Sequence, residues 1–250
     1  MEVIAKFHRV KERIIAAANK AHRNPEDIKL IAVSKYASTT QIQELIKAGH
    51  RDFGENRVQN LQIRVEEIRN WVADTFNSGA PLAEPIQWHM IGHLQRNKAA
   101  AALEFCDLIH GVDSLRLAEH LNDLGQTRAW PIPILMQINT SGEPGKNGVP
   151  IPAAIPMAEQ FETMAHLKLI GLMTMARQSD NPEDARRSFS LLRETFEELR
   201  FCRICGPHFR HLSMGMSGDF EVAIAEGATM VRIGSAIFGS HQEPAMELRT

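Results

Sequence analysis

Cysteine is scarce in this chain of 250 residues, which contains only Cys106, Cys202 and Cys205. Three thiols are too few for a disulfide framework, so the sequence favours a reducing, cytoplasmic setting. Cys202 and Cys205 form a C-x-x-C pair, but no second pair of Cys or His stands at the spacing of a zinc site. We therefore expect no metal site. A chain of this length can bury a substantial core without metal or disulfide support.

The chain also lacks an excess of charge and a long apolar run. Its 28 basic and 30 acidic residues give a net charge of −2, which provides no electrostatic footprint for nucleic acid or an anionic membrane. No apolar run approaches the length of a membrane span. The N-terminal stretch 1–20 is charged and amphipathic, without the apolar core or cleavage site of a secretion signal. No extra interface element appears, so we expect a monomer.

Eight short, apolar runs alternate with amphipathic helical stretches along the whole chain. Near-continuous apolar runs are typical of parallel strands that are buried on both faces. The predicted strands are 28–34, 51–54, 86–92, 107–113, 132–139, 168–175, 211–216 and 229–234.

Helix start signals stand between these runs. Ser38, a preferred N-cap residue, precedes an apolar helical stripe, and further signals predict helices over 181–199 and 220–226. Two stretches rich in Gly, Pro, Ser and Asn, 73–85 and 141–152, read as loops.

Strands that alternate with helices predict βαβ units and a parallel sheet. Eight such units in 250 residues fit an α/β fold with one closed, TIM-type (β/α)₈ barrel. The alternative is an open, doubly wound sheet, but the Gly-rich phosphate loop expected after its first strand is missing. No linker composition appears, so we expect a single domain over residues 1–250.

In such a barrel the active site forms at the C-terminal ends of the strands. Lys35 follows the first predicted strand directly, which puts its amine at the barrel mouth. Partial desolvation there would lower the pKa of the lysine, and a neutral amine can form an imine with an aldehyde. The alternative is that Lys35 is simply the first exposed residue after a strand.

The loops after the seventh and eighth strands commonly hold a phosphate in these barrels. Both loops are rich in small residues, whose backbones approach an anion closely and whose hydroxyls donate hydrogen bonds. They contain Ser213, Gly215, Ser217, Gly218, Gly234 and Ser235. Ordinary turns would use the same residue types, so this reading also stays open.

Two further polar residues belong to the predicted mouth. Arg232 lies inside the eighth strand, where a buried charge needs a partner; that partner is either a structural ion pair or a ligand group. Asn56 follows the second strand and could orient a ligand, cap the next helix, or do both.

These residues, in this order, resemble the family of pyridoxal phosphate homeostasis proteins. The resemblance covers nearly the whole chain, and the combination of motifs is highly specific. The matching stretches are Ala32–Tyr36, Asp52–Gln59, Trp88–Lys98, Asn139 with Glu143, Lys146 and Gly148, Gly171–Met175, Ser213–Phe220 and Val231–Gly239. Departures from the family pattern are Tyr36, His93 and a longer loop over 74–85.

The resemblance implies a barrel like the N-terminal domain of alanine racemase, that is, a fold-type III protein that binds pyridoxal 5′-phosphate (PLP). It implies that Lys35 forms the Schiff base, that Arg232 faces the pyridine nitrogen, and that Asn56 lies near the cofactor ring. It places the phosphate among five small residues: Ser213, Gly215, Ser217, Gly234 and Ser235. It implies no established enzymatic activity.

An arginine at the ring nitrogen keeps that nitrogen unprotonated, which weakens the cofactor as an electron sink. A racemase compensates with bases on both faces of its substrate. The chain ends eleven residues after Gly239, so we expect no second domain to supply such a base. Tyr36 neighbours Lys35 and would point elsewhere if the strand were regular.

We therefore expect a non-enzymatic PLP carrier or regulator in vitamin B6 and amino/keto-acid balance. PLP-dependent apoenzymes or a metabolic regulator are its expected partners. A PLP-dependent, racemase-like enzyme is one alternative, and a scaffold that uses bound PLP as a sensor is another.

Overall fold

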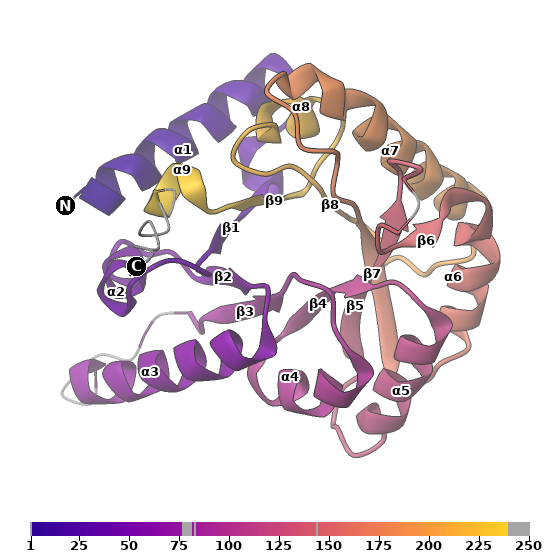
Figure 1. The fold of residues 1–250 in the computed structure, drawn as a ribbon, viewed down its shortest axis with the longest axis horizontal. Helices are drawn as coiled ribbons and strands as arrows, with labels where there is room; N and C mark the ends of the chain where they lie inside the picture. Colours follow the sequence, from indigo (N-terminus) through magenta and orange to yellow (C-terminus); the bar gives the residue numbers. More distant parts are fainter. Residues whose placement is uncertain (1, 77–81, 83, 144, 240–250) are drawn as a thin grey trace, which may run out of the picture.

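The chain folds into a closed barrel of parallel strands. The structure, a computed structural model, describes residues 2–239 except 77–81, 83 and 144. Strand β4 pairs with β5 and β1 pairs with β9, so the sheet closes on itself (Figure 1). The eight strands are β1 (Lys29–Val33), β2 (Asp52–Glu55), β3 (Gln87–Met90), β4 (Leu108–Val112), β5 (Ile132–Asn139), β7 (Leu167–Met173), β8 (His211–Ser213) and β9 (Met230–Ile233). The predicted (β/α)₈ barrel is confirmed. The doubly wound alternative is wrong, because an open sheet has two unpaired edge strands, whereas here the pairing of β4 with β5 closes the sheet.

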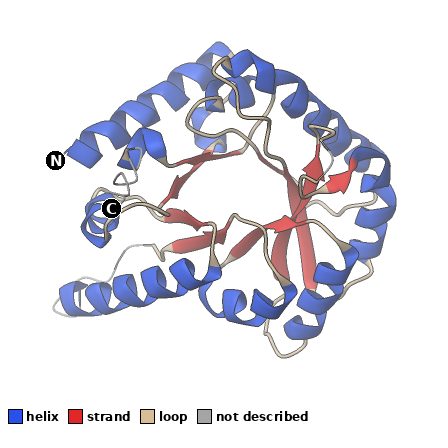
Figure 2. Ribbon diagram, in the orientation of Figure 1, coloured by secondary structure: helices blue, strands red, loops and turns tan. Residues whose placement is uncertain are grey.

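Helices surround the barrel as an outer ring (Figure 2). The α-helices are α1 (Glu2–Lys20), α2 (Thr39–Lys47), α3 (Val58–Phe76), α4 (Ala99–Phe105), α5 (Leu115–Gly125), α6 (Ala154–Glu162), α7 (Arg186–Phe201), α8 (Phe220–Ala225) and α9 (Ser235–Phe238). Short 3₁₀ helices cover Pro25–Asp27, Arg96–Lys98, Ile151–Ala153 and Pro182–Ala185. Helix α1 packs against α8 and α9, so the N-terminal and C-terminal elements lie side by side.

Local signals in the sequence explain where several helices begin. Ser38 and Gln41 form a capping box at the start of α2, in which each side chain accepts a hydrogen bond from the other residue's backbone N–H. Asn181 accepts a hydrogen bond from the backbone N–H of Glu183 and caps the turn before α7. The predicted helix over 181–199 therefore starts as a 3₁₀ turn and continues to Phe201.

The two predicted loops were partly wrong. In the stretch 73–85, residues 73–76 continue helix α3, while 77–81 and 83 lie outside the described residues. In the stretch 141–152, strand β6 (Val149–Pro150) pairs with the end of β5, and a 3₁₀ helix follows it. Proline and glycine favoured a loop, but pairing with the last two residues of β5, Ile138 and Asn139, accommodates a strand of only two residues.

The interior of the barrel contains both apolar and polar side chains. The apolar part is a cluster of Ile31, Leu108, Leu135, Met173 and Met230. Laterally paired residues of a parallel sheet point to the same face, and polar residues are register partners of this cluster. The pairs include Ile31 with Arg232, His89 with Leu108, and Met173 with Ser213. A packed core with a buried polar component therefore lies directly below the barrel mouth.

The turn after β8 depends on glycine at position 215. Gly215 has a φ of 92°, and a Cβ there would lie 2.6 Å from the Cβ of Ala223 in helix α8. Its carbonyl accepts a hydrogen bond from the backbone N–H of Arg232, which ties the turn to β9.

We expect Gly215→Ala to lower the free energy of unfolding by about 2–3 kcal/mol, because it adds backbone strain and a steric overlap. Gly218→Ala is the matched control in the same turn, since nothing lies within 4 Å of a Cβ at that position. It should change stability by less than about 0.5 kcal/mol. Urea denaturation monitored by circular dichroism measures both, and equal stability of the two variants would contradict this account of the turn.

Candidate functional site

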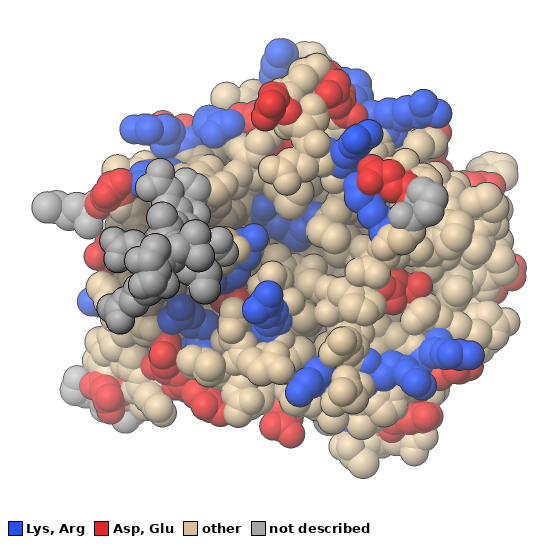
Figure 3. Space-filling model, viewed as in Figure 1, with Lys and Arg blue, Asp and Glu red and all other residues tan. Residues whose placement is uncertain are grey.

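A cavity of about 720 Å³ opens at the C-terminal end of the barrel strands. This is the end at which such barrels carry their active sites. Figure 3 shows the hollow at the centre of the molecule, with Lys and Arg side chains inside it and around it. Six of the eight predicted site residues line the cavity: Lys35, Asn56, Ser217, Arg232, Gly234 and Ser235. Ser213 and Gly215 do not line it.

Lys35 lies at the end of β1 and is exposed to solvent, so it is less desolvated than we expected. Its ammonium nitrogen lies 4.8 Å from the centroid of the Tyr36 ring. The expectation that Tyr36 points elsewhere is therefore wrong. Strand β1 ends at Val33, and residues 35 and 36 form a turn, so the alternation of a regular strand does not apply to them.

The loops after β8 and β9 meet at one side of the cavity. The Ser217 hydroxyl accepts a hydrogen bond of 3.3 Å from the backbone N–H of Ala236, which joins the two loops. A Cβ at Gly234 would lie 3.2 Å from the carbonyl oxygen of Val33, so this position brings the β9 loop close to β1. Small residues of both loops thus form one continuous wall beside the mouth lysine.

The charge of the cavity lining is strongly positive. Among the described residues, the lining includes four basic side chains, Lys35, Arg57, Arg177 and Arg232, and one carboxylate, Asp219. Asp219 accepts a hydrogen bond of 2.6 Å from the backbone N–H of Met216, so one of its carboxylate oxygens is already hydrogen-bonded within the turn. This set of donors fits an anionic ligand of the size of a small cofactor.

Arg232 is buried, with only 3% of its surface exposed. It donates hydrogen bonds to the Ser213 hydroxyl, at 2.7 Å, and to the carbonyl oxygen of Thr174, at 2.9 Å. Among the described residues no carboxylate lies within ion-pair distance of Arg232, and its hydrogen-bond acceptors are the uncharged Ser213 and Thr174 groups. Burial lowers the pKa of Arg232 to about 10, and Asp219 opposes this shift; the guanidinium remains charged at neutral pH.

A chain of buried hydrogen bonds leads from Arg232 to the opposite end of the barrel. The Ser213 hydroxyl lies 2.9 Å from Nδ1 of His110, and Nε2 of His110 lies 3.0 Å from Nδ1 of His89. Nε2 of His89 lies 3.1 Å from a carboxylate oxygen of Asp52, which also binds Lys29. Burial, and then the neighbouring His89, hold the pKa of His110 well below 6.5, so its imidazole is neutral.

Sequence reasoning missed this chain. His89 appeared in the sequence analysis only within the matching stretch Trp88–Lys98, and His110 and Asp52 were not singled out. The signal was present in the predicted strand 107–113, where His110 stands among apolar residues at a position that faces the barrel interior.

Asn56 lines the cavity two residues before helix α3 begins. Its neighbour Glu55 is buried and accepts a hydrogen bond of 2.6 Å from Ser34, and it does not line the cavity. His93, at the rim, lies 2.9 Å from Asp113. Asn56 is thus placed to contact a ligand directly, as are Arg57 and His93, which also line the cavity.

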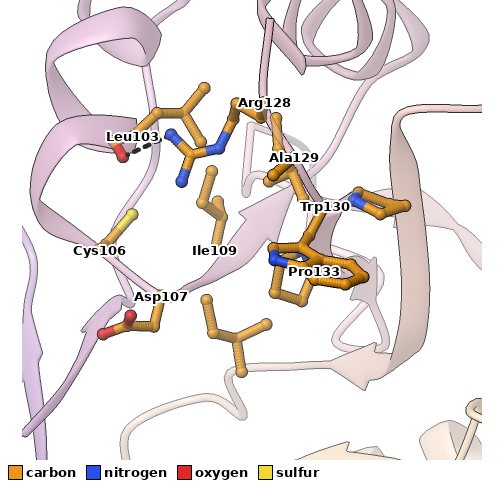
Figure 4. A pocket seen from close by; sticks show the side chains of 11 residues that line it. Leu103, Cys106, Asp107, Ile109, Arg128, Ala129, Trp130 and Pro133 are labelled. Carbon is orange, nitrogen blue, oxygen red and sulfur yellow. Dashed lines mark hydrogen bonds between the residues drawn. The ribbon is translucent and has the colours of Figure 1, made fainter. Parts of the chain in front are cut away.

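A second cavity, of about 490 Å³, lies between α4, β4 and β5 (Figure 4). It is lined by the first residues of β4 and β5 and by the segments that precede them, at the end of the barrel remote from the mouth. Arg128 there donates a hydrogen bond to the carbonyl oxygen of Leu103. Burial raises the pKa of the Cys106 thiol to about 12, which makes it unreactive. Neither side chain is therefore available for a reaction, and the cavity at the barrel mouth is the better candidate for the functional site.

In the described residues no helix combines the length and apolar character that a membrane crossing requires. A family model for the N-terminal domain of alanine racemase matches residues 8–242. The pyridoxal phosphate homeostasis protein of Escherichia coli (strain K12) is 39% identical over 232 residues, which cover 92% of this chain and 93% of that protein.

Solved structures agree with this assignment. The structure of PipY from Synechococcus elongatus with PLP bound has a TM-score of 0.75 and 31% identity, covering 92% of this chain and all of that chain (100%). An alanine racemase from Clostridium difficile has a TM-score of 0.68 at 12% identity and shares the fold, with 97% of this chain matching 57% of that one. The chain belongs to the pyridoxal phosphate homeostasis protein family, whose barrel is that of the alanine racemase N-terminal domain.

Proposed function

We propose that this protein binds PLP at the barrel mouth, through a Schiff base on Lys35, and acts in the intracellular homeostasis of vitamin B6 and of amino and keto acids. It would do so in the cytoplasm, as a monomeric, single-domain protein of residues 1–250. PLP-dependent apoenzymes or a metabolic regulator would be its partners.

The observation that carries this proposal is the composition of one cavity. It combines an exposed lysine amine, a wall of small residues and a buried arginine, in a lining with four basic side chains and one carboxylate. An aldehyde with a dianionic phosphate needs an amine and an anion site at opposite ends. The solved relative with PLP bound supports the choice of this aldehyde over others.

Different residues of the cavity would contact different parts of the cofactor. The Lys35 amine would hold the aldehyde carbon, and the small residues Ser217, Gly234 and Ser235 would hold the phosphate through hydroxyl and backbone N–H donors. Arg232 would donate to the ring nitrogen, and Asn56 would contact the hydroxyl side of the ring. Ser213 and Gly215 would support this cradle from beneath. PLP supplies an aldehyde and an electron-withdrawing ring when bound.

The absence of a committed reaction is part of the proposal. A racemase needs a base on each face of its substrate, whereas Tyr36 lies against the Lys35 ammonium. An arginine at the ring nitrogen would also leave the ring a weak electron sink. Tight, specific binding with little carbanion chemistry suits storage or delivery of a reactive aldehyde.

Adding PLP to the purified protein should produce an imine absorption band in the wild type, and Lys35→Ala should abolish it. Only a covalent link to Lys35 gives this result, since the variant keeps the phosphate wall. The near-visible absorption spectrum is recorded before and after reduction with borohydride. Mass analysis of the peptides from the reduced protein then identifies the labelled lysine.

Lys168→Ala is the matched control for this experiment. Lys168 is an exposed lysine in strand β7 that does not line the cavity, so it should keep the band. A band of equal strength in Lys35→Ala, or none in the wild type, would overturn the proposed binding mode.

The PLP-loaded protein should racemise no free amino acid faster than PLP in buffer does. The assay follows the exchange of the α-proton of each common amino acid with D₂O by proton NMR. Multiple turnovers that disappear in Lys35→Ala would instead favour the racemase-like alternative, with Tyr36 as the second base.

A further inference from the structure

The ionisation of Asp52 constrains the direction of donation in the hydrogen-bond chain between Arg232 and Asp52. Asp52 lies between Lys29 and His89; burial raises the pKa of its carboxyl, but hydrogen bonds from His89 and Lys29 outweigh this and hold the pKa below the usual range. The carboxylate is therefore ionised and can only accept hydrogen bonds. His89 must then donate to it from Nε2.

The direction propagates from one residue to the next. In the state in which His89 carries one proton, on Nε2, its Nδ1 is free to accept, and His110 then donates from its own Nε2. Nδ1 of the neutral His110 is then an acceptor, and the Ser213 hydroxyl must donate to it. With its only proton used in this way, Ser213 faces Arg232 as an acceptor.

The far end of the chain is the guanidinium of Arg232, which has donors only. Arg232 donates a hydrogen bond of 2.7 Å to Ser213, which is the shortest of the four hydrogen bonds between Arg232 and Asp52. The chain therefore runs from a buried cation to a carboxylate through Ser213, His110 and His89, and in this state every donor points the same way. Hydrogen bonds in such a series polarise one another in a region of low dielectric.

We propose that His110 and Ser213 are positioning residues for Arg232, which act through this chain of hydrogen bonds to fix the guanidinium that meets the cofactor ring. The inference rests on the proposed function, because it assigns a role toward bound PLP. Ser213 would then act on the ring nitrogen through Arg232 rather than on the phosphate. Ser213, His110 and His89 are each at most 3% exposed and do not line the cavity, so their effect on a ligand has to be indirect.

The experiment uses full-length protein loaded with PLP labelled with ¹⁵N in the ring. The nitrogen chemical shift reports the hydrogen bond at that atom, and a merely structural change elsewhere would leave it unmoved. Ser213→Ala and His110→Phe should each shift this signal toward that of the imine in water. Each should weaken PLP binding about tenfold, the effect of one lost hydrogen bond to a charged group.

Conservative variants provide a rescue. Ser213→Thr keeps the hydroxyl, and His110→Asn keeps an acceptor near the place of Nδ1, so both should retain most of the wild-type signal. Gln137→Met is the matched control, because Gln137 is buried in the same barrel interior but takes no part in the chain. It should leave the ring-nitrogen signal unchanged.

Pyridoxal, which lacks the phosphate, separates the two roles of Ser213. If Ser213 acts through Arg232, Ser213→Ala should weaken pyridoxal and PLP binding by the same factor. A loss confined to PLP, or an unchanged ring-nitrogen signal in folded Ser213→Ala and His110→Phe, would overturn the inference. Wild-type protein that forms no imine band with PLP would overturn the proposed function and this inference with it, whereas an intact band with unmoved variants would overturn the inference alone.

Discussion

A guanidinium buried inside a closed barrel, which forms no ion pair with any described residue, is the constraint on which this site depends. Desolvating a cation is costly unless hydrogen bonds replace its water. Arg232 finds two such acceptors, the Ser213 hydroxyl and the Thr174 carbonyl, and the hydrogen bonds continue from Ser213 to Asp52 across the barrel. The polar side chains of the interior thus stabilise this charge, and the apolar cluster around Ile31 and Met173 packs among them.

The same pair of strands couples that charge to the wall of small residues. Strands β8 and β9 carry Ser213 and Arg232 in the interior, and their loops carry Ser217 and Gly234 at the rim. The backbone N–H of Arg232 donates to the carbonyl of Gly215, at the turn between these two levels. A shift of this turn would therefore move the arginine and the small-residue wall together. Gly215, with its positive φ and close contact to α8, therefore stands at the point where the two strands are tied together.

The sequence predicted the barrel because its signals are local and repeated. All eight apolar runs became strands, since a strand that is buried on both faces has few polar positions to obscure it. The mouth residues could also be predicted, because the rule that strand ends carry the site needs only the order of elements. The hydrogen-bond chain was different. Asp52, His89, His110 and Ser213 come from four separate strands, and their contacts depend on barrel closure and register, which no local pattern contains. The orientation of Tyr36 was mispredicted for a related reason, because the strand ends two residues before Lys35 and its alternation was extended too far.

The contrast between Lys35 and Arg232 bears on how a bound aldehyde would be released. Arg232 lies buried at the floor of the cavity, whereas Lys35 is exposed at its rim. In the proposed function the ring nitrogen would therefore face the protected end and the carbon held by the lysine would face solvent. Water, free amines and the lysine of an apoenzyme would all approach from that side, at the atom where the link to the protein has to break. A catalytic site would gain from closing over this carbon, because excluded water strengthens its electrostatics. An open carbon above a fixed ring is instead the arrangement that lets a carrier hold its cargo by the ring and phosphate and exchange it at the aldehyde.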